Sequence, residues 1–134
     1  MYDCDPGECT SNYAIYAISG LTWMEFPLSS IGATSSTNGF SNTEMIVNSG
    51  NNNPAAQACW DYEVDGFDDW YLPAIDQLDE IESESAGLTD FNFFTQYWSS
   101  TEIDANNANY YEQGIIRSGS KFSSYNVLCI RDLN

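Results

Sequence analysis

The stretch Gly66-Phe-Asp-Asp-Trp-Tyr-Leu-Pro73 separates two helical patterns in the middle of this chain. Gly66 is typical of the residue that ends a helix, and Pro73 is typical of the first turn of the next one. Between them, Trp70-Tyr71-Leu72 is a brief apolar segment. We therefore predict two helices that are joined through this stretch.

The first helix begins at Pro54, where the preceding Asn53 is a capping residue. Its apolar side chains share one face at helical spacing, namely Ala55, Ala58, Cys59 and Tyr62. The second helix has a weaker stripe, formed by Ile75, Leu78, Asp79 and Ile81, with acidic residues on its outer side. A shorter helix is expected from Asn42-Thr43 through Val47.

Strand patterns lie on both sides of the helices. Residues 13–18 are aromatic and β-branched and predict a first strand, and residues 29–42 read as a loop. After Gly87, short runs separated by Gly, Asn and Ser predict several antiparallel strands: Phe93-Phe94, Tyr97-Trp98, Tyr110-Tyr111, Ile115-Ile116 and 127–130. This order indicates an α+β fold. We expect a tether or disulfide-closed end at residues 1–12 and a single domain at residues 13–134.

The charge of the chain excludes several classes of function. With 20 Asp and Glu against 3 Lys and Arg, the formal net charge is −17, and there is no histidine. A nucleic-acid groove needs a cluster of cations, so nucleic acid is not an expected partner. Without histidine, Ser-His-Asp catalysis and His-ligated zinc are excluded. No apolar run approaches the ~20 residues of a membrane span, so no membrane insertion is expected. The acidic residues after Met1 do not resemble a signal peptide.

The four cysteines form an even set that favours disulfides. Cys4 and Cys9 bracket a turn sequence, whereas Cys59 and Cys129 lie far apart in apolar segments. A bridge between the distant pair would remove roughly 4 kcal/mol of unfolded-chain freedom, and it requires an oxidising compartment. A zinc site is the alternative, although the paired Cys-x-x-Cys spacing of strong zinc motifs is missing.

Metal and enzyme chemistry have weak signals in this sequence. The acidic residues from Asp61 to Asp69 resemble the start of a calcium loop, but the twelfth position is Leu72 instead of a bidentate acid. A weak Ca²⁺ site therefore stays open, and no other metal or cofactor is expected. Pairs of carboxylates can be chosen freely from 20 acids, so their presence does not indicate a glycosidase. We expect no catalytic residues and no enzyme activity.

Residues 97–126 have a different composition, in which Tyr, Asn and Ser alternate with glycine. Tyrosine supplies rigid contact area and Asn or Ser supplies adaptable hydrogen bonds, as in binding loops of antibodies. The alternative is that Ser and Asn simply form loops while the aromatic residues form core. Trp98 is expected to point inward, and only one of Tyr110 and Tyr111 can do so, because strand side chains alternate between faces.

Several segments together resemble the C-type-lectin-like domain of phage tail and fibre proteins, which is also the C-terminal domain of collagen-like bacterial adhesins. The segments are residues 42–47, 55–59, 66–73, 76–78, 97–102 and 127–131. The resemblance runs from about Trp23 to Leu133. It implies two helices packed on a small antiparallel sheet with long irregular loops, with the first and last strands paired. It also supports the bridge between Cys59 and Cys129, and it places ligand binding near the C-terminus.

The chain departs from the family pattern at several points. A glycine-rich opening hairpin is absent, and Leu128 stands where a basic residue is common. No Glu-Pro-Asn or Gln-Pro-Asp motif is present, so calcium-dependent sugar binding is not implied.

The sequence thus predicts a non-enzymatic recognition or adhesion domain on a phage virion, as a tail, fibre or capsid-decoration component. Its expected partners are a host-surface glycan or protein and other virion proteins, with multivalent or homo-oligomeric display at the virion surface or outside the cell. The expected ligand-binding residues are Glu102, Asn106, Asn107, Asn109, Tyr110, Tyr111, Arg117, Lys121, Ser123 and Tyr125. Two alternatives stay open: a structural cement or spacer protein of a virion, and a secreted bacterial adhesin domain.

Overall fold

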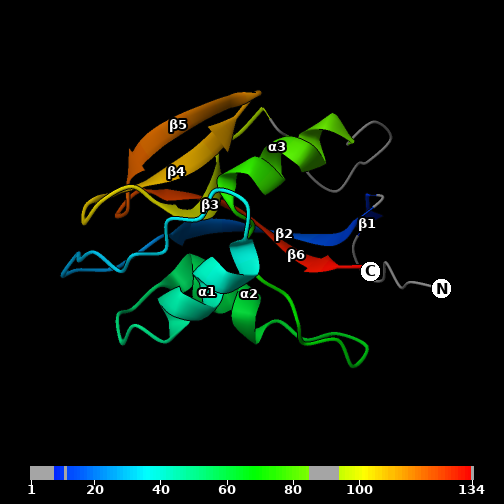
Figure 1. The fold of residues 1–134 in the computed structure, drawn as a ribbon, viewed down its shortest axis with the longest axis horizontal. Helices are drawn as coiled ribbons and strands as arrows, with labels where there is room; N and C mark the ends of the chain where they lie inside the picture. Colours follow the sequence, from blue (N-terminus) through cyan, green and yellow to red (C-terminus); the bar gives the residue numbers. More distant parts are fainter. Residues whose placement is uncertain (1–7, 11, 85–93, 134) are drawn as a thin grey trace.

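The computed structural model describes residues 8–10, 12–84 and 94–133, and these ranges contain six strands and three helices (Figure 1). In chain order the elements are β1 (Glu8–Cys9), β2 (Tyr13–Thr22), α1 (Gly39–Val47), α2 (Pro54–Asp61), α3 (Ile75–Ser83), β3 (Tyr97–Glu102), β4 (Asn107–Glu112), β5 (Ile115–Ser120) and β6 (Ser124–Asp132). Within these ranges, no helix has the length and apolar character needed to cross a membrane.

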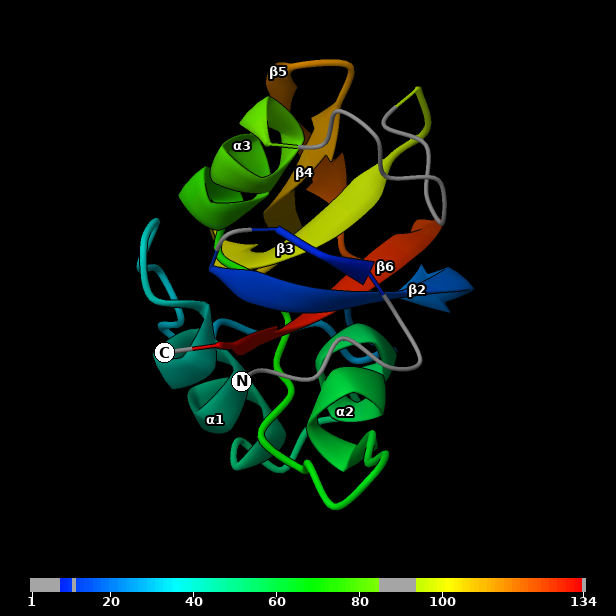
Figure 2. The same ribbon diagram turned by 90° about the vertical axis from the view of Figure 1, so that its right-hand side faces the viewer.

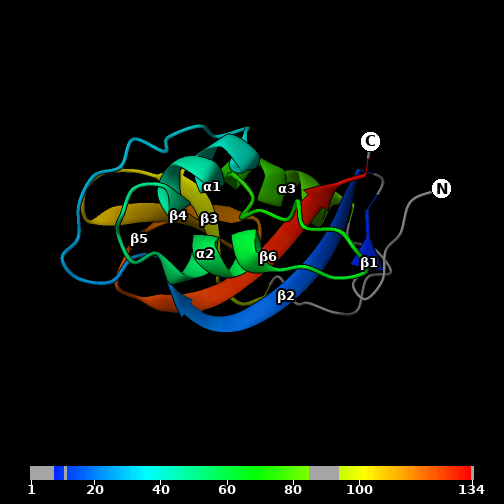
Figure 3. The ribbon, with the colours of Figure 1, turned by 90° about the horizontal axis from the view of Figure 1, so that it is seen from below.

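The six strands form one mixed sheet in the order β1-β2-β6-β3-β4-β5. β3 and β6 run parallel, whereas the other neighbouring pairs are antiparallel. β2 pairs with β6 from Tyr13 opposite Asp132 to Thr22 opposite Ser124, with a shift of register after Ile18. Figure 3 shows these two long strands side by side, with α2 next to them. The expected pairing of the strand at Tyr13 with the last strand is therefore present.

The expected C-type-lectin-like arrangement of two helices on a small antiparallel sheet is wrong. The described residues form three helices, which cover both faces of the sheet: α1 and α2 lie on one side and α3 on the other (Figures 1 and 2). α1 forms because the Asn38 side chain caps it, accepting a hydrogen bond from the Ser41 N–H at 3.0 Å, and because Ile46 is fully buried. The sheet is mixed because β3 lies between β6 and β4, parallel to the first and antiparallel to the second.

Each face of the sheet has its own apolar core, because side chains alternate along the strands. The core on the α1 and α2 side includes Trp23, Ile46, Cys59, Trp70, Leu72, Trp98, Val127 and Cys129. The core on the α3 side includes Ile15, Tyr71, Ile75, Leu78, Ile81, Tyr97, Tyr111, Leu128 and Ile130. The prediction that Trp98 points inward is confirmed, since its side chain is fully buried.

The segment between α2 and α3, residues 66–73, is fixed to β6 and β3 by main-chain hydrogen bonds. Tyr71 and Ile130 exchange two of them, with N···O distances of 2.8 and 2.9 Å. The Pro73 carbonyl accepts a third from the Ser100 N–H at 2.8 Å. These bonds satisfy buried main-chain groups that would otherwise be costly, and they determine where α3 leaves the sheet.

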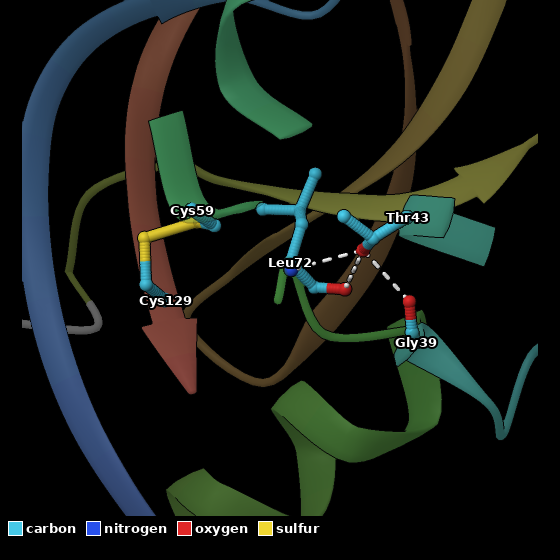
Figure 4. Close-up of a disulfide and its surroundings, with 5 residues drawn as sticks. All are labelled: Gly39, Thr43, Cys59, Leu72 and Cys129. Atoms are coloured by element: carbon cyan, nitrogen blue, oxygen red, sulfur yellow. Dashed lines mark hydrogen bonds between the residues drawn. A yellow bond between two sulfur atoms is a disulfide. The ribbon is translucent and has the colours of Figure 1, made fainter. Parts of the chain in front are cut away.

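Cys59 of α2 and Cys129 of β6 form the predicted disulfide, with a Cα–Cα distance of 5.2 Å (Figure 4). Both residues are fully buried, and because their sulfur atoms are bonded to each other, neither is a thiolate that could bind zinc. Figure 4 also shows the Thr43 hydroxyl, which accepts from the Leu72 N–H at 3.0 Å and lies 2.7 Å from the Gly39 carbonyl. Cys9 is disulfide-bonded too, whereas Cys4, its expected partner, lies outside the described residues.

Candidate recognition surface

The hairpin β4–β5 forms the outer part of the sheet and carries five of the ten predicted contact residues. Its six residue pairs run without a shift from Asn107 opposite Ser120 to Glu112 opposite Ile115. Gln113 and Gly114 close it with φ angles of 51° and 80°, the left-handed values that a two-residue hairpin turn requires. The hairpin therefore holds its side chains on a regular, well-defined backbone.

One face of this hairpin is polar and exposed to solvent. Asn107 lies opposite Ser120 and Asn109 opposite Ser118, and we refer to these four residues as the Asn/Ser face. The two serines are exposed and the two asparagines are half-buried. The Asn109 side-chain amide donates to the Arg117 carbonyl at 3.2 Å, which orients the amide oxygen. The Asn/Ser face thus presents amide and hydroxyl groups in a fixed order.

Tyr111 is on the same side of β4, but its assignment as a contact residue is wrong. α3 covers this end of the hairpin, and Tyr111 is fully buried. Its hydroxyl donates to Asp79 at 2.8 Å and also bonds Glu82. Burial, followed by the hydrogen bonds to these two carboxylates, strongly raises the pKa of the Tyr111 hydroxyl. Tyr111 therefore holds α3 on the sheet and does not reach a ligand.

Glu102 and Lys121 are also wrong as contact residues, because they form a buried ion pair. The Lys121 Nζ lies 2.6 Å from the Glu102 Oε2, and their side chains are 0% and 1% exposed. The Glu102 carboxylate also accepts hydrogen bonds from the main-chain N–H groups of Ile31 and Gly32, at 2.8 and 2.6 Å. Lys121 also donates to the Ser29 carbonyl at 2.9 Å. The pair therefore fixes the long loop before α1 to the sheet.

Tyr110 and Tyr125 are half-buried in an aromatic cluster with Trp98. Their ring centroids are 4.5 Å apart, and the Tyr125 ring lies 4.7 Å from Trp98. Gly119 is required below them, since a Cβ there would lie 2.9 Å from the Tyr110 ring. Burial is the main cause of the raised pKa of Tyr110. These two tyrosines are partly accessible and lie on the face of the sheet opposite to the Asn/Ser face.

The remaining predicted residues lie around the hairpin. Arg117 is on the Tyr110 face, with its side chain 46% exposed and its Nε 3.3 Å from Glu112. Asn106 is exposed, and Ser123 is half-buried in the turn before β6. The Asp104 carboxylate accepts from the Asn106 N–H at 2.9 Å, and this bond is the main cause of its lowered pKa. The ten predicted residues are therefore divided between two faces and the interior, and do not form one surface.

Metal ligation has no support in the described part of the chain, where no group of three or more His, Cys, Asp or Glu side chains could hold an ion. In the acidic segment considered for calcium, Val64 and Phe67 form an isolated bridge around Asp65 and Gly66. Its Asp69 pairs instead with Arg131 at 2.8 Å.

The sequence did not indicate the most exposed apolar residues of the hairpin. Ile115 and Ile116 of β5 are 48% and 49% exposed. The available signal was the turn Gln113-Gly114 directly before them, because a strand that follows a two-residue turn at a sheet edge has only one neighbour.

No family model matches this sequence, and no curated protein matches it. A crystal structure of a fimbrial protein from Bacteroides ovatus is similar in fold, with a TM-score of 0.58 over 88% of this chain and a sequence identity of 16%. This chain spans only 35% of that protein's length. The comparison therefore shows a shared fold with one part of a fimbrial protein.

These comparisons do not support a relationship with the domains of phage tail and fibre proteins. What they support is the distant likeness in structure to a fimbrial protein.

Proposed function

We propose that this chain is a non-enzymatic recognition domain of the adhesin type, which acts at a bacterial surface or outside the cell. It binds a host-surface glycan or protein through the Asn/Ser face of the β4–β5 hairpin. Of the functions considered from the sequence, we prefer the secreted bacterial adhesin domain to a component of a phage virion, because the structure reported above as similar in fold is that of a fimbrial protein.

One property of the chain supports a location outside the cytoplasm, and a second limits the partners it can bind. The disulfide between Cys59 and Cys129 joins α2 to β6 in the core, and such bonds persist in oxidising compartments. The net charge of −17 favours solubility at high local density and disfavours binding to anionic membranes or nucleic acids.

The observation that carries the proposal is the exposure of the Asn/Ser face on a rigid base. Below it, the Ser99 hydroxyl donates to the Asn109 carbonyl at 2.7 Å, and Ser99 itself is fully buried. Hydroxyl and amide groups that are fixed in this way match the hydroxyls of sugars and the polar groups of a peptide chain. A preorganised surface loses less entropy on binding than a mobile loop.

Binding of bead-multimerised protein to a glycan array and to epithelial cells tests the proposal. The double variant Asn109→Ala and Ser118→Ala should reduce binding about tenfold, since each lost hydrogen bond contributes about 0.5–1.5 kcal/mol. Asn52→Ala, an exposed change on the loop between α1 and α2, is the matched control and should bind like the wild type. Absence of binding by the wild type, or equal binding by the double variant, would contradict the proposal.

A further inference from the structure

β5 is an edge strand that lacks the usual protection against pairing. It is the last strand of the sheet, and within the described residues β4 is the strand with which it pairs. Five of its six residues are exposed, including Ile115 and Ile116. Natural edges are blunted by proline, a bulge, several charges or short length, and β5 has none of these apart from Arg117. By contrast, the opposite edge, β1, is only two residues long.

The charge pattern makes β5 the least acidic edge of a strongly acidic molecule. Residues 113–131 contain no Asp or Glu, although the whole chain has 20. Of the three Lys and Arg side chains, Lys121 is fully buried and Arg131 is 8% exposed, so only Arg117 is substantially exposed. Acidic side chains lie near both ends of the strand: Glu112 is opposite Ile115 and pairs with Arg117, and Asp104 bonds Asn107, which is opposite Ser120. Two copies that carry −17 each repel least when they approach through this edge.

We propose that β5 pairs with β5 of a second copy, so that two sheets continue into one across a two-fold axis. Such an isologous contact uses the same patch on both copies, which is the commonest form of homo-oligomer. The main-chain groups of β5 that point away from β4, and that pair with no strand in the described part of the chain, provide the hydrogen bonds, and the exposed isoleucines provide apolar area on both faces. This inference does not depend on the proposed function.

The register of the pair follows from the residues of β5. In an antiparallel pair, directly opposite side chains lie on the same face, so the axis must pass through a residue. An axis at Arg117 places two arginines opposite each other, which is unfavourable. An axis at Ser118 overlaps residues 116–120 and places each Arg117 opposite Gly119 of the other copy, so that the two arginines are not opposite each other. Of these two registers, we therefore choose the axis at Ser118.

This register joins the Asn/Ser faces of the two copies into one polar surface. Ser118 lies opposite Ser118 of the second copy, and Asn109 lies one strand further out on each side. A ligand with repeating units could then contact both Asn/Ser faces at once. After its first unit has bound to one copy, binding of a second unit to the other copy is an intramolecular step.

Cysteine cross-linking combined with sedimentation tests the pairing. Ser118→Cys should give a disulfide-linked dimer under mild oxidation, because opposite Cβ atoms about 4.5–5.5 Å apart are close to disulfide geometry. Ser120→Cys is the matched control: in this register its two copies are four residues apart along the strand, roughly 14 Å, and do not cross-link. The wild type should dimerise reversibly, and more strongly at high salt, because salt screens the repulsion between copies.

Ile116→Lys supplies an independent test, since a lysine on the edge blunts pairing without disturbing the core. It should leave the thermal unfolding curve of the monomer unchanged and raise the dimer dissociation constant at least tenfold. The proposal would be overturned by a wild type that stays monomeric up to about 1 mM protein. This limit is used because self-association that is weaker still releases no more than about 4 kcal/mol. Equal cross-linking of Ser118→Cys and Ser120→Cys, or a dimer that Ile116→Lys does not weaken, would also overturn it.

Discussion

Removal of the disulfide between Cys59 and Cys129 should strongly destabilise the domain. The bond closes a loop with a sequence separation of 70 residues between α2 and the last strand. In the loop-entropy model, this closure reduces the entropy of the unfolded chain by an amount that contributes about 4 kcal/mol at 25 °C. Domains of this size have a total stability of about 5–15 kcal/mol, so a large fraction would be lost.

The assay is equilibrium unfolding in urea of the double variant Cys59→Ala and Cys129→Ala, followed by tryptophan fluorescence. The free energy of unfolding should decrease by about 4 kcal/mol, which lowers the melting temperature by roughly 10–20 °C. Both sulfur atoms are buried, so a cavity adds to the loss. Addition of reductant to the wild type removes the cross-link without making a cavity, but it also breaks the disulfide of Cys9. The same treatment of the double variant measures the effect of the Cys9 bond and so separates the contributions. A loss below about 1 kcal/mol in both experiments would refute the idea that this bond restricts the unfolded chain.

Three further changes test the buried contacts under the hairpin and α1. Lys121→Met should cost about 3–5 kcal/mol in urea unfolding, because Glu102 is left as an unpaired buried charge, while adding Glu102→Gln should recover part of the loss. Gly39→Ala should cost about 1–3 kcal/mol, because its Cβ would lie 2.6 Å from the Leu72 carbonyl; an unchanged melting temperature would contradict this. Because folding raises the pKa of the Tyr111 hydroxyl, its contribution to the free energy of unfolding should be complete below pH 10 and should decrease above it. Tyr111→Phe should therefore reduce the dependence of the free energy of unfolding on pH above pH 10 by about 1.4 kcal/mol per pH unit.

Patterns of short range predicted much of the secondary structure correctly. The helix that Pro54 begins is present, although it ends at Asp61 and not at Gly66, and the second helix begins at Ile75, two residues after Pro73. Proline and capping residues fix the start of a helix through local geometry, so they can be read from the sequence. The end of a helix depends on packing, and here residues 62–69 leave α2 to form the turn around Asp65 and Gly66.

Tertiary contacts decided what the sequence could not. Alternation correctly places Tyr110 and Tyr111 on opposite faces of the sheet, but both faces have a core: Tyr111 is fully buried under α3, and Tyr110 is half-buried against Trp98. Likewise, Glu102 and Lys121 looked like surface charges, because the loop that surrounds them with main-chain groups is distant in sequence. Phe94 lies in a turn and not in the strand expected at Phe93-Phe94, and Phe93 lies outside the described residues.

The buried hydroxyls of β3 explain how an exposed hairpin can be held rigidly. Ser99, Ser100 and Thr101 are all buried, although serine and threonine are usually exposed. Each bonds a segment that would otherwise have unsatisfied groups: Thr101 accepts from the Ile75 N–H at 3.0 Å, Asn42 donates to the Ser100 hydroxyl at 3.2 Å, and Ser99 donates to the Asn109 carbonyl. One strand therefore connects α3, α1 and the hairpin. Because hydrogen bonds have directional requirements that apolar contacts lack, this strand fixes the orientation of the Asn/Ser face relative to the helices.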